Sequence, residues 1–146
     1  MYTSTSSMSN KHSLINEWGN FLETIDWTFY CTLTTPYSMT VNSARRKIEK
    51  LHKILTERFS LENEIFWVAE PFDTHDSYHL HVLIKFKNGM SNKSKISLNK
   101  AWQSICGKKV TGKYNWTEIE AYVPSKGANF YVAEYLQRKG VEYGYI

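Results

Sequence analysis

The chain has 146 residues, of which 42% are apolar and 15% aromatic, which fits a soluble, globular chain with room for one domain. No apolar run approaches the roughly 20 residues that cross a bilayer, so a membrane-spanning protein is excluded. The net charge of +4 is unevenly distributed, because residues 1–78 carry 7 basic and 10 acidic side chains and residues 79–146 carry 11 and 4. The second half of the chain therefore holds the positive field.

The first 12 residues are polar and lack the apolar stretch of a secretory signal. We therefore expect a flexible tail over residues 1–12, one domain over residues 13–146 and a cytoplasmic location. Cys31 and Cys106 lie far apart, and neither has a second cysteine at metal-ligand spacing. The sequence predicts two reduced core cysteines, without a disulfide framework or a thiolate zinc site.

The first part of the chain alternates between helical and strand patterns. Apolar residues at helical spacing predict amphipathic helices over residues 13–25 and 41–59. Between them, residues 27–35 (WTFYCTLTT) are rich in aromatic and β-branched side chains and end at Pro36, which predicts a central strand. Residues 64–70 and 78–86 are strand-like runs joined by the polar loop PFDTHDS, which predicts an antiparallel hairpin.

The last third of the chain continues the alternation. A short helix with one apolar face is predicted to stop at Gly107, and residues 115–123 are predicted to form a strand. Ser125 is the expected cap of a last helix that closes at Gly140, and the tail VEYGYI is a candidate short strand.

This order of elements predicts the fold class. With the first helix set aside, the core reads strand, helix, strand, strand, helix, strand, which is the split βαββαβ pattern. The sequence therefore predicts an α+β, ferredoxin-like or RRM-like antiparallel sheet with helices packed on one face.

The run YHLHVLIKF contains a candidate metal site. Alternate residues of a strand point to the same face, so His79 and His81 can converge on one ion. Across the predicted hairpin Glu70 lies roughly opposite Tyr78 or His79, so a carboxylate can join the two imidazoles. Two His and one Glu with open positions suit a divalent ion such as Mn²⁺ or Mg²⁺, and zinc would also fit.

Other ligands and other interpretations exist for this region. The loop offers Asp73, His75 and Asp76 as further ligand candidates. Alternatively, the two histidines are ordinary strand residues and Glu70 is a strand-end carboxylate that faces solvent before Pro71.

The segment FYVAEYLQRKG contains candidate nucleophiles. Tyr131 and Tyr135 are four residues apart and share a helix face, with Arg138 and Lys139 one turn beyond Tyr135. A tyrosine has an unperturbed pKa of about 10, so its attack on a phosphodiester needs nearby positive charge or a metal that polarises the phosphate. The alternative is that both tyrosines are packing residues with their hydroxyls in water.

A basic segment lies between these two motifs. From Lys85 to Lys113 the chain has eight lysines and no acidic residue, interleaved with Phe86 and Trp102. This composition is typical of a surface that contacts phosphates, and the alternative is a solvated lysine face.

Taken together, these segments resemble the His-hydrophobic-His (HUH) endonucleases, specifically the small rolling-circle replication initiators (Rep proteins) of plasmids and single-stranded DNA viruses. FYCTLTT resembles the first initiator motif, HLHVLI resembles the metal motif, and YVAEYLQRK resembles the tyrosine motif. WVAE resembles the strand that supplies a third, acidic ligand. The resemblance spans roughly residues 27–146, with the motifs in the family's order.

The resemblance implies a metal-dependent nicking and joining reaction. His79, His81 and Glu70 would bind the divalent ion, Mn²⁺ or Mg²⁺, and Tyr135 would attack DNA. Tyr135 would then carry a 5′-phosphotyrosyl link and leave a free 3′-hydroxyl, which can reverse the attack and rejoin strands without ATP.

The chain departs from the tyrosine motif at two positions. It has Glu134 where the family often has a lysine, and Arg138 stands three residues after Tyr135, with Lys139 one later. Arg138 or Lys139 would therefore stand for the motif lysine. Tyr131 stays open as a second nucleophile, because some relatives use two tyrosines on one helix turn.

The resemblance also implies partners. The substrate would be single-stranded DNA, or a duplex melted into a hairpin at a replication origin, with the lysine-rich segment 85–113 on its backbone. The sequence contains no Gly-rich phosphate loop, so a host or viral helicase and polymerase are expected partners. A homodimer is left open, and the cytoplasm would be that of the host cell for a plasmid- or virus-encoded chain.

Four rival functions fit parts of the sequence. A single-tyrosine HUH transposase would share metal site and nucleophile, but FYCTLTT resembles initiators more closely; a relaxase fits less well, because its tyrosine usually precedes the histidines. A non-catalytic RRM-like nucleic-acid-binding module would stack bases on its sheet, but leaves the His pair and Glu70 without a role. A metal hydrolase that uses water would survive loss of both tyrosines.

Overall fold

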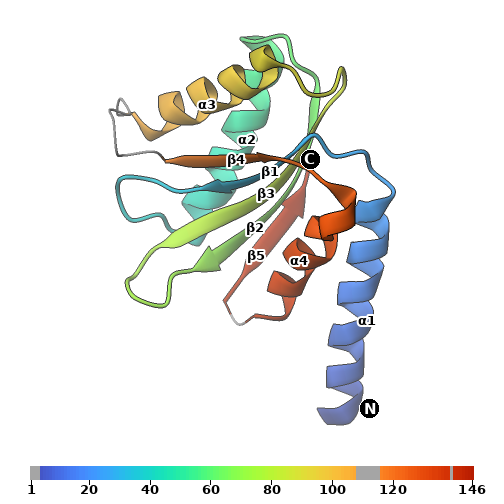
Figure 1. Ribbon diagram of the computed structural model, residues 1–146. Coiled ribbons are helices and arrows are strands. Elements are labelled where there is room, and N and C mark those ends of the chain that lie inside the picture. The colour runs from blue at the N-terminus through green and yellow to red at the C-terminus, as the bar shows by residue number, and fades with distance from the viewer. Residues whose placement is uncertain (1–3, 108–115, 139) are drawn as a thin grey trace.

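The computed structural model describes residues 4–107, 116–138 and 140–146, which form a five-stranded sheet flanked by helices (Figure 1). The elements in chain order, with η marking short 3₁₀ turns, are α1 Ser4–Glu23, β1 Phe29–Leu33, α2 Val41–Glu57, β2 Asn63–Pro71, β3 Tyr78–Phe86, α3 Asn92–Cys106, β4 Thr117–Ala121, η1 Pro124–Lys126, α4 Ala128–Glu134, η2 Tyr135–Gln137 and β5 Glu142–Tyr145.

The sheet has the strand order β4-β1-β3-β2-β5, and every neighbouring pair is antiparallel. The segment from β1 to β4 follows the split βαββαβ pattern, so the predicted α+β fold class is confirmed. The predicted β2–β3 hairpin is also present, and β1 is paired on both sides, as expected for an interior strand. The C-terminal tail adds β5 beside β2.

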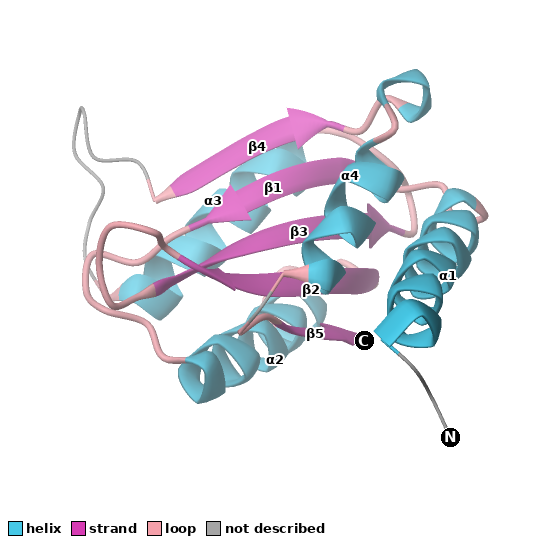
Figure 2. Ribbon diagram, turned by 90° about the horizontal axis from the view of Figure 1, so that it is seen from below, coloured by secondary structure: helices cyan, strands magenta, loops and turns pink. Residues whose placement is uncertain are grey.

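The two helices of this pattern, α2 and α3, cover the same face of the sheet (Figure 2). Ile48 and Leu51 of α2 and Trp102 of α3 are fully buried against the strand residues of that face, such as Val82. This core is the larger of two hydrophobic clusters. It holds the sheet rigid from behind, since side chains at alternate strand positions interdigitate with both helices.

The opposite face of the sheet is covered in part by α1 and α4. Leu22 of α1 and Val132 of α4 pack with Phe66, Val68 and Leu83, which alternate with the residues of the larger core. The helix α1 begins at Ser4 rather than near residue 13, because its first turns are polar and give no apolar periodicity. Within the described ranges, no helix is both long and apolar enough to span a bilayer.

The helix around the tyrosine motif differs from its prediction. One continuous helix from a Ser125 cap to Gly140 was expected, but Ser125 lies in η1. Gly127 adopts a left-handed backbone conformation (φ 67°) that ends η1, and α4 starts after it. The α-helix then tightens into η2 at Tyr135, and Arg138 is extended (φ −78°, ψ 144°). A glycine without Cβ strain therefore breaks the expected helix near its start.

Both cysteines are free and buried, as predicted. Burial raises the pKa of the Cys106 thiol to about 11, and burial also raises the pKa of the Cys31 thiol. Neither thiol is therefore a thiolate nucleophile at neutral pH.

Candidate metal centre and nucleophile

The register of the β2–β3 hairpin brings the predicted metal ligands together. Glu70 is directly opposite His79, and Val68 is opposite His81, so the three ligand candidates share the sheet face that carries α4. Nε2 of His79 lies 2.9 Å from Oε1 of Glu70, and Nε2 of His81 lies 3.3 Å from the same oxygen. We call Glu70, His79 and His81 the metal centre.

The metal centre is largely withdrawn from water, which keeps its imidazoles neutral. Burial lowers the pKa of His79, against the attraction of the Glu70 carboxylate. Burial, and then the neighbouring His79, lower the pKa of His81 to about 4, although Glu70 again opposes the shift. A neutral imidazole keeps the lone pair that a metal ligand needs.

The donor set fits a divalent ion. One nitrogen from each imidazole and one carboxylate oxygen all lie within 4.8 Å of one another, so one ion could contact all three. Two nitrogens and one oxygen, with the remaining positions open, suit Mn²⁺, Mg²⁺ or zinc. The loop candidates do not join this group: Asp73, His75 and Asp76 are exposed in the β2–β3 turn.

Tyr135 lies directly against the metal centre. Its ring stacks on the ring of His81, with centroids 4.0 Å apart and planes 8° apart, and the residue is buried. Tyr131 lies in α4, but its side chain is outside the described part of the chain. Among the predicted nucleophiles, the structure thus brings Tyr135 to the predicted ligands.

Arg138 joins the tyrosine to the metal centre. Its guanidinium donates a hydrogen bond to Oε2 of Glu70, and its Cζ lies 4.7 Å from the centroid of the Tyr135 ring. The extended backbone of Arg138 after η2 turns the side chain back toward the sheet. The other predicted cation, Lys139, lies outside the described residues.

Sequence reasoning missed Tyr30, which contacts the metal centre from β1. Its hydroxyl oxygen lies 3.4 Å from Nδ1 of His81, part-buried in the sheet. If Nε2 of His81 binds a metal, Nδ1 carries the proton and donates it to this hydroxyl, which orients the ring. Tyr30 stands in the FYCTLTT strand, but only the pairing of β1 with β3 reveals its partner.

We expect Tyr30→Phe to weaken Mn²⁺ binding by about 10-fold, at the low end of the 10–100-fold that loss of such an outer partner costs. The ring remains, so only the hydroxyl next to His81 is removed. Titration calorimetry of Mn²⁺ measures the effect, with Tyr143→Phe on β5 as the control. Equal affinities of the two variants would contradict this role for Tyr30.

A second aromatic residue missed from the sequence is Phe72, which follows β2. Its ring lies 4.4 Å from that of His79 and stacks on His75 at 4.3 Å. Phe72 therefore limits the movement of the His79 ring and separates it from the hairpin loop. A phenylalanine in a polar loop gives no sequence signal of this contact.

The helix α1 holds α4, and hence Tyr135, on the sheet. Nδ2 of Asn129 donates to the Gly19 carbonyl at 3.0 Å, and the Tyr122 hydroxyl donates to Oδ1 of Asn129 at 3.1 Å. Asn129 is almost fully buried. The two helices touch at Gly19, where a Cβ atom would lie only 2.4 Å from the Phe130 ring.

We expect Asn129→Ala to lower the free energy of unfolding by about 1–3 kcal/mol, because it leaves a buried carbonyl and a hydroxyl without their partner. Urea denaturation measures the change. The exposed Asn20→Ala on α1 is the matched control and should stay within about 0.5 kcal/mol of wild type. A stability of Asn129→Ala equal to that of the control would contradict the contact.

The lysine-rich segment is not brought to the metal centre. Lys93, Lys95 and Lys100 are exposed on α3, which covers the other face of the sheet. Lys108, Lys109 and Lys113 fall in the undescribed stretch 108–115.

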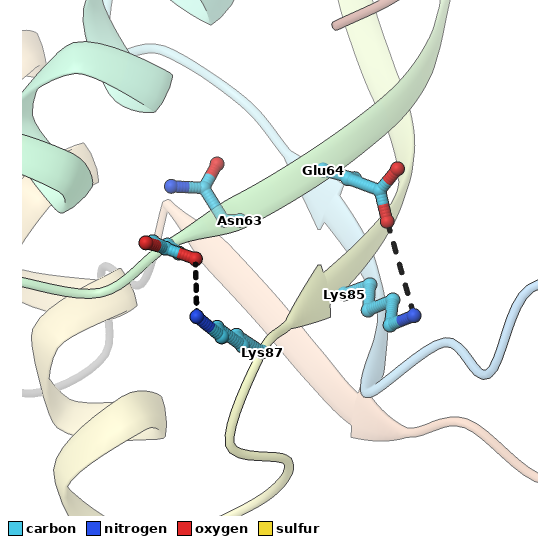
Figure 3. A pocket seen from close by; sticks show the side chains of 5 residues that line it. Asn63, Glu64, Lys85 and Lys87 are labelled. Atoms are coloured by element: carbon cyan, nitrogen blue, oxygen red, sulfur yellow. Dashed lines mark ion pairs between the residues drawn. The ribbon is translucent and has the colours of Figure 1, made fainter.

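The first lysines of the segment line a small pocket of about 250 Å³ at the far end of the β2–β3 hairpin (Figure 3). There Lys85 lies 3.9 Å from Glu64, and Lys87 lies 3.2 Å from Glu62. These cations already face carboxylates, so this pocket is a poor site for phosphate.

Comparison with known proteins gives one match. The family model described as Replication-associated protein ORF2 matches residues 28–140. No curated protein and no solved structure matches the chain. The matched range contains the metal centre, Tyr135 and Arg138, whereas α1 precedes it.

Proposed function

Because the chain belongs to the Replication-associated protein ORF2 family, we propose that it is a metal-dependent endonuclease that starts rolling-circle replication of a plasmid or virus. The enzyme nicks and rejoins single-stranded DNA through a 5′-phosphotyrosine on Tyr135. This proposal keeps the likeness to the HUH Rep proteins as its mechanism. The family itself implies a role in replication and DNA as the partner.

The contact between Tyr135 and His81 is the observation that carries the proposal. A phenol stacked at 4.0 Å on a ligand of the metal centre is within reach of any phosphate bound there. A non-catalytic RRM-like module has no need for a buried Glu and two neutral imidazoles at the base of such a tyrosine. The replication family also favours an initiator over a transposase.

The metal centre supplies the electrophilic half of the reaction. A divalent ion held by Glu70, His79 and His81 would polarise the scissile phosphate and stabilise charge on its oxygens. Tyr30 and Phe72 keep the imidazoles in place from two sides.

Tyr135 supplies the nucleophile. Its hydroxyl oxygen attacks phosphorus and loses its proton to solvent, while the bond from phosphorus to the 3′ oxygen breaks and that oxygen takes up a proton. The products are a phosphotyrosyl 5′ end and a free 3′-hydroxyl, and the reverse attack by a 3′-hydroxyl restores the phosphodiester.

Arg138 takes the place of the motif lysine in this account. Its guanidinium lies beside both the Tyr135 ring and Glu70, so it stabilises negative charge that develops between nucleophile and metal centre. Lys139 and Tyr131 stay as secondary candidates, the former as a phosphate contact and the latter as an alternate nucleophile.

Nicking of a pool of labelled single-stranded oligonucleotides and hairpins tests the proposal. With Mn²⁺, we expect cleavage that leaves a 3′ end extendable by a polymerase and a 5′ end blocked to phosphorylation by a kinase. Chelator should stop the reaction. A 5′ end open to the kinase would instead indicate water as the nucleophile, and binding without cleavage would support a non-catalytic module.

A further inference from the structure

A pocket of about 500 Å³ opens beside the metal centre, between the loop after β1 and the β2–β3 turn. Three rings, Tyr37, Phe72 and Trp116, form part of its wall. The hydroxyl residues Thr34 and Ser38 also line it. Its volume lies within the range of small-ligand sites.

The chemistry of the lining differs from that of the neighbouring hollows. Among the described residues, no Asp, Glu, Lys or Arg lines this pocket, whereas Glu64 and Lys85 line the pocket at the far end of the hairpin (Figure 3). A second groove, between α3 and β4, contains Glu118 and Glu120. Rings together with neutral hydrogen-bonding groups match a nucleobase, which has a flat π-face and a polar edge, better than they match a phosphate.

The pocket shares one residue with the surroundings of the metal centre. Phe72 lines the pocket and also packs on His79, with ring centroids 4.4 Å apart. A DNA strand whose scissile phosphate lies at the metal centre therefore passes the pocket within a short stretch of chain.

The walls of the pocket are held in place before any ligand binds. The backbone N–H of Met39 donates to the Ser77 hydroxyl at 2.9 Å, and the N–H of Tyr78 donates to the Met39 carbonyl at 3.0 Å. The Trp102 indole donates to the Thr34 carbonyl at 2.7 Å. These bonds tie the loop after β1 to the hairpin and to α3, so binding would require little reorganisation.

Tyr37 is the ring most available to a ligand. The residue is 41% exposed, and the Lys47 ammonium lies 5.2 Å from its ring centroid. This cation–π contact holds the ring across the mouth of the pocket, and the cation adds positive charge close to a passing phosphate backbone.

We propose that this pocket binds one nucleobase of the DNA strand next to the scissile phosphate, with Tyr37 as the stacking residue. The inference rests on the proposed function, because it assigns part of the same DNA strand. It adds the place where the strand is held and a source of sequence preference outside the metal centre.

Binding of a fluorescent single-stranded oligonucleotide in the presence of chelator tests the pocket without cleavage. We expect Tyr37→Ala to weaken binding by roughly 5- to 100-fold, the range that loss of one stacked base costs. Tyr145→Ala is the matched control, since Tyr145 is equally exposed (39%) but lies on β5 beside Phe66. The control should keep the wild-type affinity.

An abasic scan of the same oligonucleotide identifies the base. One abasic position should weaken binding to the wild type and have no further effect on Tyr37→Ala. Additive losses at every position, or equal affinities of the two tyrosine variants, would overturn the pocket. Position-dependent binding without metal-dependent nicking would instead overturn the proposed function and leave the pocket standing.

Discussion

Tyr135→Phe is expected to abolish the covalent DNA adduct and to slow nicking by on the order of 10⁴-fold or more, because the attacking oxygen is lost. The phenylalanine ring can keep the stack on His81, so Mn²⁺ affinity should stay close to that of the wild type. A gel assay of labelled oligonucleotides measures nicking, and calorimetry measures the metal. The two readouts separate chemistry from site assembly.

Tyr131→Phe is the matched control, four residues earlier in α4. It should nick at the wild-type rate if Tyr135 is the single nucleophile. Nicking that survives in Tyr135→Phe and is lost in Tyr131→Phe would exchange the roles of the two tyrosines. Nicking that survives in the double variant would assign the attack to water.

His81→Ala is expected to remove metal-dependent cleavage. Its loss takes away one of three ligands together with the ring that supports Tyr135, so Mn²⁺ affinity should fall by more than the about 100-fold upper range for an outer partner. Calorimetry and the nicking assay measure the two consequences.

His75→Ala serves as the control for this change. His75 is an exposed histidine of the hairpin loop that lies outside the metal centre, so its loss should leave Mn²⁺ affinity unchanged. Circular dichroism checks that both variants keep the fold. If folded His81→Ala bound Mn²⁺ as tightly as the wild type, the metal centre would be wrongly assigned.

The metal centre could be predicted from the sequence because its geometry follows from strand alternation. His79 and His81 are two residues apart in one strand, and a short loop sets Glu70 against His79 with little freedom in register. The same reasoning yields the βαββαβ order, since each element carries its own periodicity. These parts depend on contacts that are near in sequence.

The surroundings of the metal centre could not be predicted in the same way. Tyr30 reaches His81 only because β1 pairs with β3, and Arg138 reaches Glu70 only because η2 and an extended residue end the tyrosine helix. Helical periodicity places Arg138 on the helix surface. Such contacts depend on long-range packing, which no local pattern encodes.

The lysine-rich segment shows the limit of composition. A run of lysines without acids indicates a basic surface, but not the face of the sheet on which it lies. The structure puts Lys93, Lys95 and Lys100 on α3, behind the sheet from the metal centre. Close contacts to DNA at the site are therefore expected first from Arg138 and from the loop beside Tyr37.

Peptide mass spectrometry of the protein after reaction with single-stranded DNA and Mn²⁺ tests the central claim most directly. We predict a nucleotide adduct on Tyr135 that forms with Mn²⁺ and is absent with chelator. An adduct on another residue, or cleavage of the DNA without any adduct, would contradict nicking by Tyr135 at this metal centre.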